Sequence, residues 1–198
     1  METSLLELPL PLRIVPSAPV SDDALIAFSR ANKGLRIEKN SKGEIVVMTP
    51  AGRRGDWREK ELAVALDSWA QADGRGEANG ANAGWNLSDG STLSPDASWT
   101  ASERLARFSD EEQERFLPIC PDFVAEIRSR SDSITDLQEK MERWIANGAR
   151  LAWLIDPFTR TAYIYQPGRP AEALHAPAVL EGEGPLAGFR LEMARFWA

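Results

Sequence analysis

The chain has 198 residues, of which 43% are hydrophobic, which is enough for one domain with an ordinary core. Its longest apolar runs, such as residues 151–155, are far shorter than the roughly 20 residues that cross a bilayer, so we expect no transmembrane helix. The opening residues lack the basic region of a secretory signal, and we therefore expect a cytoplasmic protein.

The formal net charge of −7 bears on the partners of this chain. Neutralisation of phosphates supplies most of the affinity in nonspecific nucleic-acid binding, so an acidic chain is poorly suited to it. A local basic groove can still coexist with an acidic remainder, and a metal-dependent nuclease needs acidic side chains. The charge therefore argues against a generally basic DNA-binding protein and leaves a local DNA site open.

Two residue types that often carry chemistry occur only once each, as Cys120 and His175. A single cysteine excludes an internal disulfide and a cysteine-rich zinc cluster. Catalysis by a Ser-His-Asp triad would have to use His175, which we expect in an exposed loop. Any metal site must then be built from oxygen ligands, which suit Mg²⁺ or Mn²⁺.

The first half of the chain is predicted to contain an arm followed by regular elements. Residues 1–20 hold four prolines, which favours an extended arm ahead of a single domain over residues 21–198. Capping residues, alternation and apolar spacing then predict a helix over 21–32, a hairpin over 35–39 and 44–48, and a long helix over 56–72.

The second half is predicted to alternate between strands and helices. The expected elements are a strand pair over 84–87 and 92–99, a short helix starting at 109–112, a strand over 122–128, a helix over 135–147, and strands over 151–155 and 161–165. This order indicates an α/β protein with a mixed sheet.

Two acids on predicted strands form the candidate site. Side chains alternate along a strand, so Glu126 and Arg128 share one face of the strand over 122–128. We expect Asp96, on the preceding strand run, to reach a metal that Glu126 also touches. The alternative is a structural ion pair of Glu126 with Arg128 or Arg130.

Such a set of residues fits the hydrolysis of a phosphodiester. A divalent ion held by two carboxylates lowers the pKa of water and polarises a phosphoryl oxygen. A lysine or arginine then stabilises the charge that develops in the transition state.

Several segments together resemble a known family. They are residues 93–99 (Leu-Ser-Pro-Asp-Ala-Ser-Trp), 120–133, 137–140 and 147–157, with the hairpin end at 47–50 and the closing 188–191. In order and type they are similar to the Uma-type restriction endonuclease family of the PD-(D/E)XK superfamily, over roughly residues 21–198. The resemblance implies an α/β restriction-endonuclease-like core, a mixed β-sheet flanked by helices, with an N-terminal helix and hairpin.

The resemblance also implies site residues. Asp96 and Glu126 match the acidic motif positions, and both would hold Mg²⁺ or Mn²⁺. Arg128 falls where the superfamily pattern has its lysine, which departs from Glu-x-Lys. The family shows a lysine on the following helix, matched here by Lys140, and an acid in the first hairpin, matched by Glu38.

The residues themselves leave alternatives open. Lys140 lies about 60° from the centre of its helix's apolar stripe, so it either reaches a strand end or faces solvent. Glu38 could be an ordinary exposed strand acid. Basic residues near the long helix, namely Arg53, Arg54, Arg58 and Lys60, could contact phosphate or form a solvated helix end. Trp85 and Trp99 could stack on bases, although core packing is the more common role.

The function that these observations favour is a divalent-metal-dependent DNA endonuclease. A homodimer would suit the cutting of both strands, because two-fold symmetry pairs two sites. One alternative is a catalytically silent binding or interaction domain that keeps the nuclease fold. Another is a two-carboxylate hydrolase of a different substrate class, such as a glycosidase.

Overall fold

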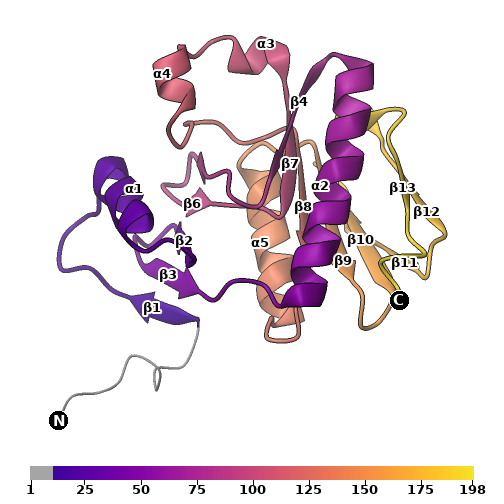
Figure 1. Cartoon of the computed structure of the whole chain (residues 1–198), viewed down its shortest axis with the longest axis horizontal. Coiled ribbons are helices and arrows are strands. Elements are labelled where there is room, and N and C mark those ends of the chain that lie inside the picture. The colour runs from indigo at the N-terminus through magenta and orange to yellow at the C-terminus, as the bar shows by residue number, and fades with distance from the viewer. Residues whose placement is uncertain (1–10) are drawn as a thin grey trace.

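A computed structural model describes residues 11–198 of the protein (Figure 1). Its centre is a six-stranded mixed sheet in the order β11-β10-β9-β8-β7-β4. The strands are β4 (Gly76–Gly80), β7 (Ala97–Ala101), β8 (Phe123–Ile127), β9 (Leu151–Asp156), β10 (Thr161–Tyr165) and β11 (Glu172–His175). Only β8 and β9 run parallel, and every other neighbouring pair is antiparallel.

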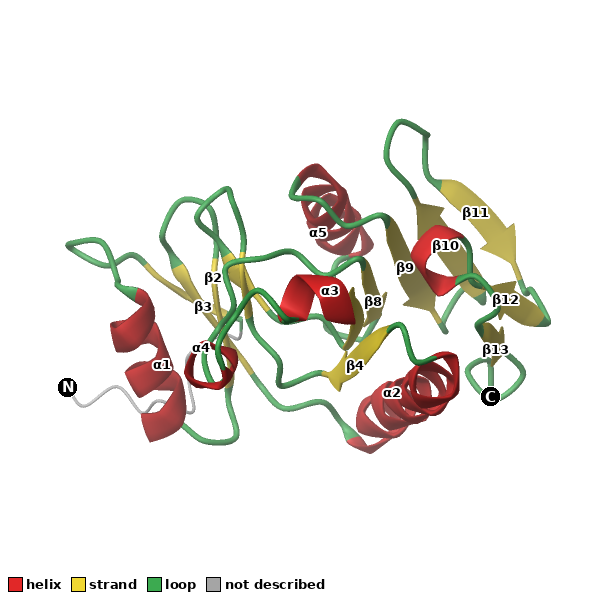
Figure 2. Ribbon diagram, turned by 90° about the horizontal axis from the view of Figure 1, so that it is seen from above, coloured by secondary structure: helices red, strands yellow, loops and turns green. Residues whose placement is uncertain are grey.

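Two helices cover the faces of this sheet, with α2 (Arg53–Asp73) on one side and α5 (Ile134–Ala146) on the other (Figure 2). The α5 helix connects β8 to β9, as a parallel pair requires. Every residue of β8 and β9 is buried, because both faces are covered. This explains the continuous apolar runs in the sequence at these positions.

The core has one cluster on each face of the sheet. On the α2 face, Leu62 and Leu66 pack with Trp99 and Trp153, and the C-terminal segment closes this cluster with Phe189. That segment contains β12 (Val179–Glu181), a 3₁₀ turn (Gly184–Leu186) and β13 (Arg190–Glu192). On the α5 face, Met141 and Trp144 pack with Trp85 and Val124. Both candidate stacking residues, Trp85 and Trp99, are therefore core residues.

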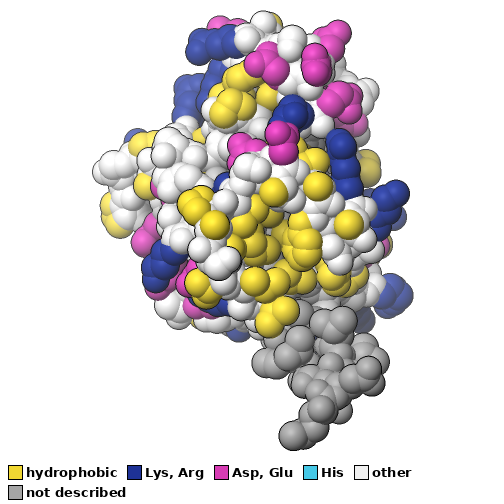
Figure 3. Space-filling view, turned by 90° about the vertical axis from the view of Figure 1, so that its left-hand side faces the viewer, with side chains coloured by type: hydrophobic (Ala, Val, Ile, Leu, Met, Phe, Trp, Pro, Cys, Tyr) yellow, Lys and Arg dark blue, Asp and Glu magenta, His cyan; other side chains and the backbone are white. Residues whose placement is uncertain are grey.

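A second sheet lies at the N-terminal end of the molecule, in the order β1-β3-β2-β6-β5. It contains β1 (Leu12–Ile14), β2 (Arg36–Lys39), β3 (Ile45–Met48), β5 (Trp85–Asn86) and β6 (Thr92–Leu93), and helix α1 (Asp22–Ala31) packs beside it. Figure 3 views this end and shows hydrophobic side chains gathered on its surface. Two short helices, α3 (Ser102–Leu105) and α4 (Asp110–Gln113), follow β7.

Most of the predicted elements are confirmed. The α1 helix is capped by Ser21, the hairpin forms as β2 and β3, and α4 begins with the expected capping box at Ser109. The long helix begins earlier than predicted, at Arg53. Of the arm expected over 1–20, residues 1–10 lie outside the described part of the chain, and Leu12–Ile14 forms β1, which pairs with β3.

The strand predicted over 92–99 is wrong as a single element. It divides into β6, in the N-terminal sheet, and β7, in the six-stranded sheet. The division falls at Pro95, which has no backbone N–H to give to a ladder. As a result, Asp96 lies where the chain crosses from one sheet to the other.

Among residues 11–198, no helix combines the length and the apolar composition needed to span a membrane.

Candidate active site

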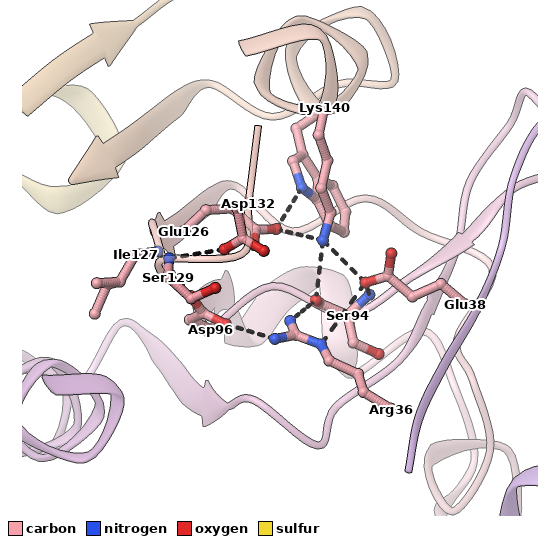
Figure 4. A network of polar contacts seen from close by, with 10 residues as sticks. Arg36, Glu38, Ser94, Asp96, Glu126, Ile127, Ser129, Asp132 and Lys140 are labelled. Carbon is pink, nitrogen blue, oxygen red and sulfur yellow. Dashed lines mark hydrogen bonds and ion pairs between the residues drawn. The ribbon is translucent and has the colours of Figure 1, made fainter. Parts of the chain in front are cut away.

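The backbone fixes Asp96 at the edge of the six-stranded sheet. Its N–H donates to the carbonyl oxygen of Ala125 at 3.0 Å, which continues the pairing of β7 with β8. Its Oδ2 accepts a hydrogen bond from the backbone N–H of Ile127 at 2.7 Å. Because Ile127 follows Glu126, Glu126 on β8 and Asp96 just before β7 lie beside one another (Figure 4).

Helix α5 supplies the partners of Glu126. The Lys140 ammonium lies 2.8 Å from Glu126 Oε1, and the indole N–H of Trp144 donates to the same oxygen at 3.3 Å. Lys140 and Trp144 are four residues apart, so both point from one face of the helix onto β8. The side chain of Glu126 is only 4% exposed. Lys140 therefore reaches the strand and does not face solvent.

Lys140 also joins the two sheets. Its Nζ lies 2.9 Å from Glu38 Oε1 and donates to the carbonyl oxygen of Ser94 at 3.4 Å. Glu38 comes from β2 and accepts a second hydrogen bond from the Ser94 N–H at 3.1 Å. The alternative of an ordinary exposed strand acid at Glu38 is wrong, because Glu38 is only 6% exposed.

Arg36 completes the cluster and was not found from the sequence. Its guanidinium donates to Asp96 Oδ1 at 2.7 Å and to the carbonyl oxygen of Ser94, and it lies 3.8 Å from Glu38. Arg36 and Glu38 are two apart on one strand and so share a face. That alternation was the signal available in the sequence.

The cluster sets three buried carboxylates against two cations. Burial, with repulsion from Asp96, raises the pKa of Glu126 to about 7 although Lys140 opposes the shift. Burial would also raise the pKa of Glu38, but Lys140 and Arg36 outweigh it and the pKa is lowered. The pKa of Lys140 is raised, because attraction to Glu126 and Glu38 exceeds the cost of its burial. Such perturbed groups are typical of functional sites.

Glu59 is a further acid near this cluster that the sequence did not single out. It lies on α2, and burial together with repulsion from Asp96 raises its pKa to about 7. Helix α2 therefore brings a fourth acid, Glu59, towards the edge of the sheet where Asp96 lies. Its proximity depends on how α2 packs on β7 and β8, which no local pattern reports.

Arg128 does not join Glu126. Its guanidinium donates to Asp156 Oδ2 at 2.8 Å and to the carbonyl oxygen of Asp132 at 3.3 Å. In the parallel register Ile127 lies opposite Ile155, so Asp156 is the neighbour of Arg128 across the sheet. The ionic partner of Glu126 is thus Lys140, and neither Arg128 nor Arg130 pairs with it among the described residues.

Two of the basic residues predicted near the start of the long helix, Arg54 and Arg58, have a structural role. Arg58 is 8% exposed, and its guanidinium donates to the carbonyl oxygens of Phe196 and Ala198 at 3.1 and 2.9 Å. Arg54 donates to the carbonyl oxygen of Ala198 at 3.3 Å. These two arginines therefore hold the C-terminal segment against the helix.

Asp96 and Glu126 offer carboxylate oxygens, the kind of ligand that a hard divalent ion such as Mg²⁺ prefers. Within residues 11–198, no group of three or more His, Cys, Asp or Glu side chains is arranged to hold a metal. Mg²⁺ commonly takes only one or two protein carboxylates and keeps water or substrate oxygens for the rest. Asp96 and Glu126 satisfy that requirement, but their oxygens are engaged by Arg36, Lys140 and backbone or indole N–H groups, so an ion must compete with these partners.

The fold matches that of a protein of known structure. A crystal structure described as "a putative nuclease belonging to DUF820" from Anabaena variabilis ATCC 29413 superposes with a TM-score of 0.71 at 21% identity, covering 87% of this chain and 96% of that chain. A much weaker likeness, with a TM-score of 0.40 and 15% identity over 63% of this chain and 10% of the other, is to a cryo-EM structure of a DrdV–DNA complex.

The sequence matches the Uma2 family, described as "Putative restriction endonuclease", over residues 23–194. The chain therefore belongs to this family, as its motifs indicated. No curated protein matches the sequence.

Proposed function

We propose that this protein is a divalent-metal-dependent DNA endonuclease that hydrolyses phosphodiester bonds at the Asp96–Glu126 site. The observation that supports it best is the Lys140 ammonium, 2.8 Å from the buried Glu126 and aimed at the sheet edge that carries Asp96. Burying several charges costs stability unless they are paired, and buried groups with perturbed pKa values in such a cluster are candidates for a functional site.

Each residue of the cluster has a role in this proposal. Asp96 and Glu126 would hold Mg²⁺ or Mn²⁺, which supplies polarisation of the phosphoryl oxygen and activation of water when it is bound. Lys140 stabilises negative charge that develops on the phosphoryl group. Glu38 is a positioning residue, because its ion pair with Lys140 holds the ammonium between the two sheets.

The proposal includes a DNA substrate, the cytoplasmic location expected from the sequence, and a homodimer. A second copy would place two sites for the two strands of a duplex. The apolar surface at the α1 end is the candidate dimer contact.

A second candidate function is a catalytically silent binding domain with the nuclease fold. It is favoured by the ion pairs of the cluster, since Asp96, Glu126 and Glu38 each already have a cationic partner. A protein in which these pairs served only folding would keep the cluster and show no turnover.

The test is cleavage of supercoiled plasmid at low salt. We expect nicked or linear product with Mg²⁺ or Mn²⁺ and none with EDTA. Glu126→Gln, purified in the same way, controls for contaminating nuclease and should be silent. Because this change removes one negative charge, DNA binding should be kept or improved, and loss of cutting with binding retained is the signature of catalysis.

Two further variants compare the candidate cations. Lys140→Met should lower the cleavage rate by about 100-fold, the usual scale for loss of a transition-state charge partner. Arg128→Met should have a smaller effect on the rate, because its guanidinium is held by Asp156. A parent protein that shifts DNA in a gel but never cuts it would favour the silent-domain function.

A further inference from the structure

An exposed aromatic side chain flanked by two arginines lies beside the candidate active site. Phe158 is 41% exposed, although large apolar side chains are usually covered. The guanidinium carbons of Arg128 and Arg130 lie 5.7 and 5.1 Å from the centre of its ring. Both distances are within the range of cation–π contact. We call these three residues the Arg–Phe–Arg cluster.

The topology brings this cluster to the edge of the sheet that carries the acids. Strands β8 and β9 are parallel, so the residues that follow both strands meet at one edge. Arg128 directly follows Ile127, whose N–H bonds to Asp96. Phe158 follows β9 at the same edge. The cluster is therefore continuous with the Asp96–Glu126 site.

One buried carboxylate holds the cluster in place. Asp156 Oδ2 accepts from Arg128 at 2.8 Å, while Oδ1 accepts from the backbone N–H groups of Phe158 at 2.9 Å and Thr159 at 3.3 Å. These bonds outweigh the burial of Asp156 and lower its pKa, so it stays charged at neutral pH. A single side chain thus fixes both the turn that presents Phe158 and the guanidinium beside it.

Arg130 is the free cation of the cluster. It is exposed, and no carboxylate of the described residues lies within ion-pair distance of it. A guanidinium that rests on an aromatic ring keeps its N–H edges open, and those edges match the two oxygens of a phosphate. In a chain of net charge −7, an uncompensated cation next to the acids is where a DNA strand can approach.

We propose that the Arg–Phe–Arg cluster is a phosphate-contact surface that holds the DNA backbone against the Asp96–Glu126 site. The inference rests on the proposed DNA endonuclease function. It assigns Arg130 to phosphate binding and Phe158 to the apolar support of its guanidinium, while Arg128, which Asp156 holds, packs against the same ring.

The experiment measures binding of a short fluorescein-labelled DNA duplex by anisotropy over a series of salt concentrations. Ca²⁺ is present as the divalent ion, and the labelled strand is checked for cleavage on a denaturing gel. Arg130→Gln is the principal variant. The Arg130 side chain has no buried polar partner among the described residues, so its replacement leaves no buried group unpaired. Arg107→Gln is the matched control, since it removes the same charge from an exposed position between α3 and α4, which follow the far end of β7 (Figure 1).

We expect Arg130→Gln to weaken binding several-fold at low salt and to reduce the salt slope of the affinity by about 1, the effect of one lost phosphate contact. Arg107→Gln should keep the slope of the parent. If Arg130→Gln and Arg107→Gln have the same slope as the parent, the cluster does not contact phosphate and the inference is overturned. In that case the cleavage test with Glu126→Gln still decides the proposed function separately. A parent that binds no duplex overturns the inference together with the DNA substrate.

Discussion

Arg36 occupies the Asp96 oxygen that a metal ion would need. Its guanidinium lies 2.7 Å from Oδ1, and Oδ2 is already engaged by the Ile127 N–H. The Nε atom of Arg36 is buried and makes no hydrogen bond with the described residues, so its own polar groups are not fully satisfied here. Both oxygens of Asp96 thus have partners within the protein, one of them the Arg36 cation.

The first prediction is that Arg36→Met tightens metal binding. Loss of this competitor should raise the affinity for Mn²⁺ about tenfold. That factor corresponds to roughly 1.4 kcal/mol, the free energy that the ion no longer spends on breaking the Arg36–Asp96 ion pair. Isothermal titration calorimetry with Mn²⁺ measures the change without any need for turnover. Arg30→Met, on the exposed face of α1, serves as the control.

Asp96→Asn should abolish the same titration while the protein stays folded. If Arg36→Met binds Mn²⁺ no more tightly than the parent, Arg36 does not compete at Asp96. The outcome would then point to a metal held elsewhere or to none.

At this scale the sequence reached only part of the cluster. Asp96, Glu126, Lys140 and Glu38 were singled out, mainly through the family resemblance, and the structure brings them together. Arg36 was missed although it shares a strand face with Glu38, and Glu59 was missed because its position depends on contacts between segments far apart in the chain. Arg128 was expected beside Glu126, but it forms an ion pair with Asp156 on the neighbouring strand β9.

Strand β4 is a whole element that the sequence pattern did not predict. Residues 76–80 read Gly-Glu-Ala-Asn-Gly, which has none of the β-branched or aromatic residues that mark strands. It nevertheless pairs with β7 along its full length. Long periodic elements such as α2 and α5 were predictable from local pattern, whereas β4 is a strand because β7 gives it a partner.

The second prediction concerns the glycine at the start of β4. A Cβ on Gly76 would lie 2.3 Å from the Trp99 ring and 2.5 Å from the Thr100 carbonyl oxygen. Both neighbours are held in the core sheet, so Gly76→Ala should lower the free energy of unfolding by about 1–3 kcal/mol through overpacking. Urea unfolding followed by tryptophan fluorescence measures the loss.

Gly80, in the same strand, provides the matched control. A Cβ there would meet only the Ala63 Cβ at 3.8 Å, which is ordinary contact. Gly80→Ala should therefore change the free energy of unfolding by less than about 0.5 kcal/mol. Equal losses for both variants would mean that the close approach of Trp99 is not what restricts position 76.

On the scale of the whole molecule, the exposed apolar side chains are concentrated at one end. Of the six large hydrophobic residues that are exposed in the described chain, four lie between residues 14 and 35, namely Ile14, Val15, Phe28 and Leu35. They belong to β1, α1 and the segments next to them, at the end of the molecule shown in Figure 3. An apolar surface of this kind commonly marks a contact with another protein.

The neighbouring sheet edge indicates which protein would cover this surface. Strand β1 is the outermost strand of the five-stranded sheet, and edge strands can pair with a copy of themselves across a two-fold axis. A two-fold dimer also matches the proposed cutting of both DNA strands. A second copy of this chain is therefore the expected occupant, and the active-site edge of the six-stranded sheet would stay open.

The last prediction is that the parent protein is a dimer and that Val15→Asp with Phe28→Asp makes it a monomer. Val15 is 74% exposed, so a charge there costs little in the monomer but would be unpaired and desolvated in the interface. Val64→Asp is the matched control, because Val64 is 58% exposed on α2, away from this surface. Sedimentation velocity at micromolar concentration separates the cases. A monomeric parent, or a dimer that survives the double substitution, would show that the apolar end does not join two copies.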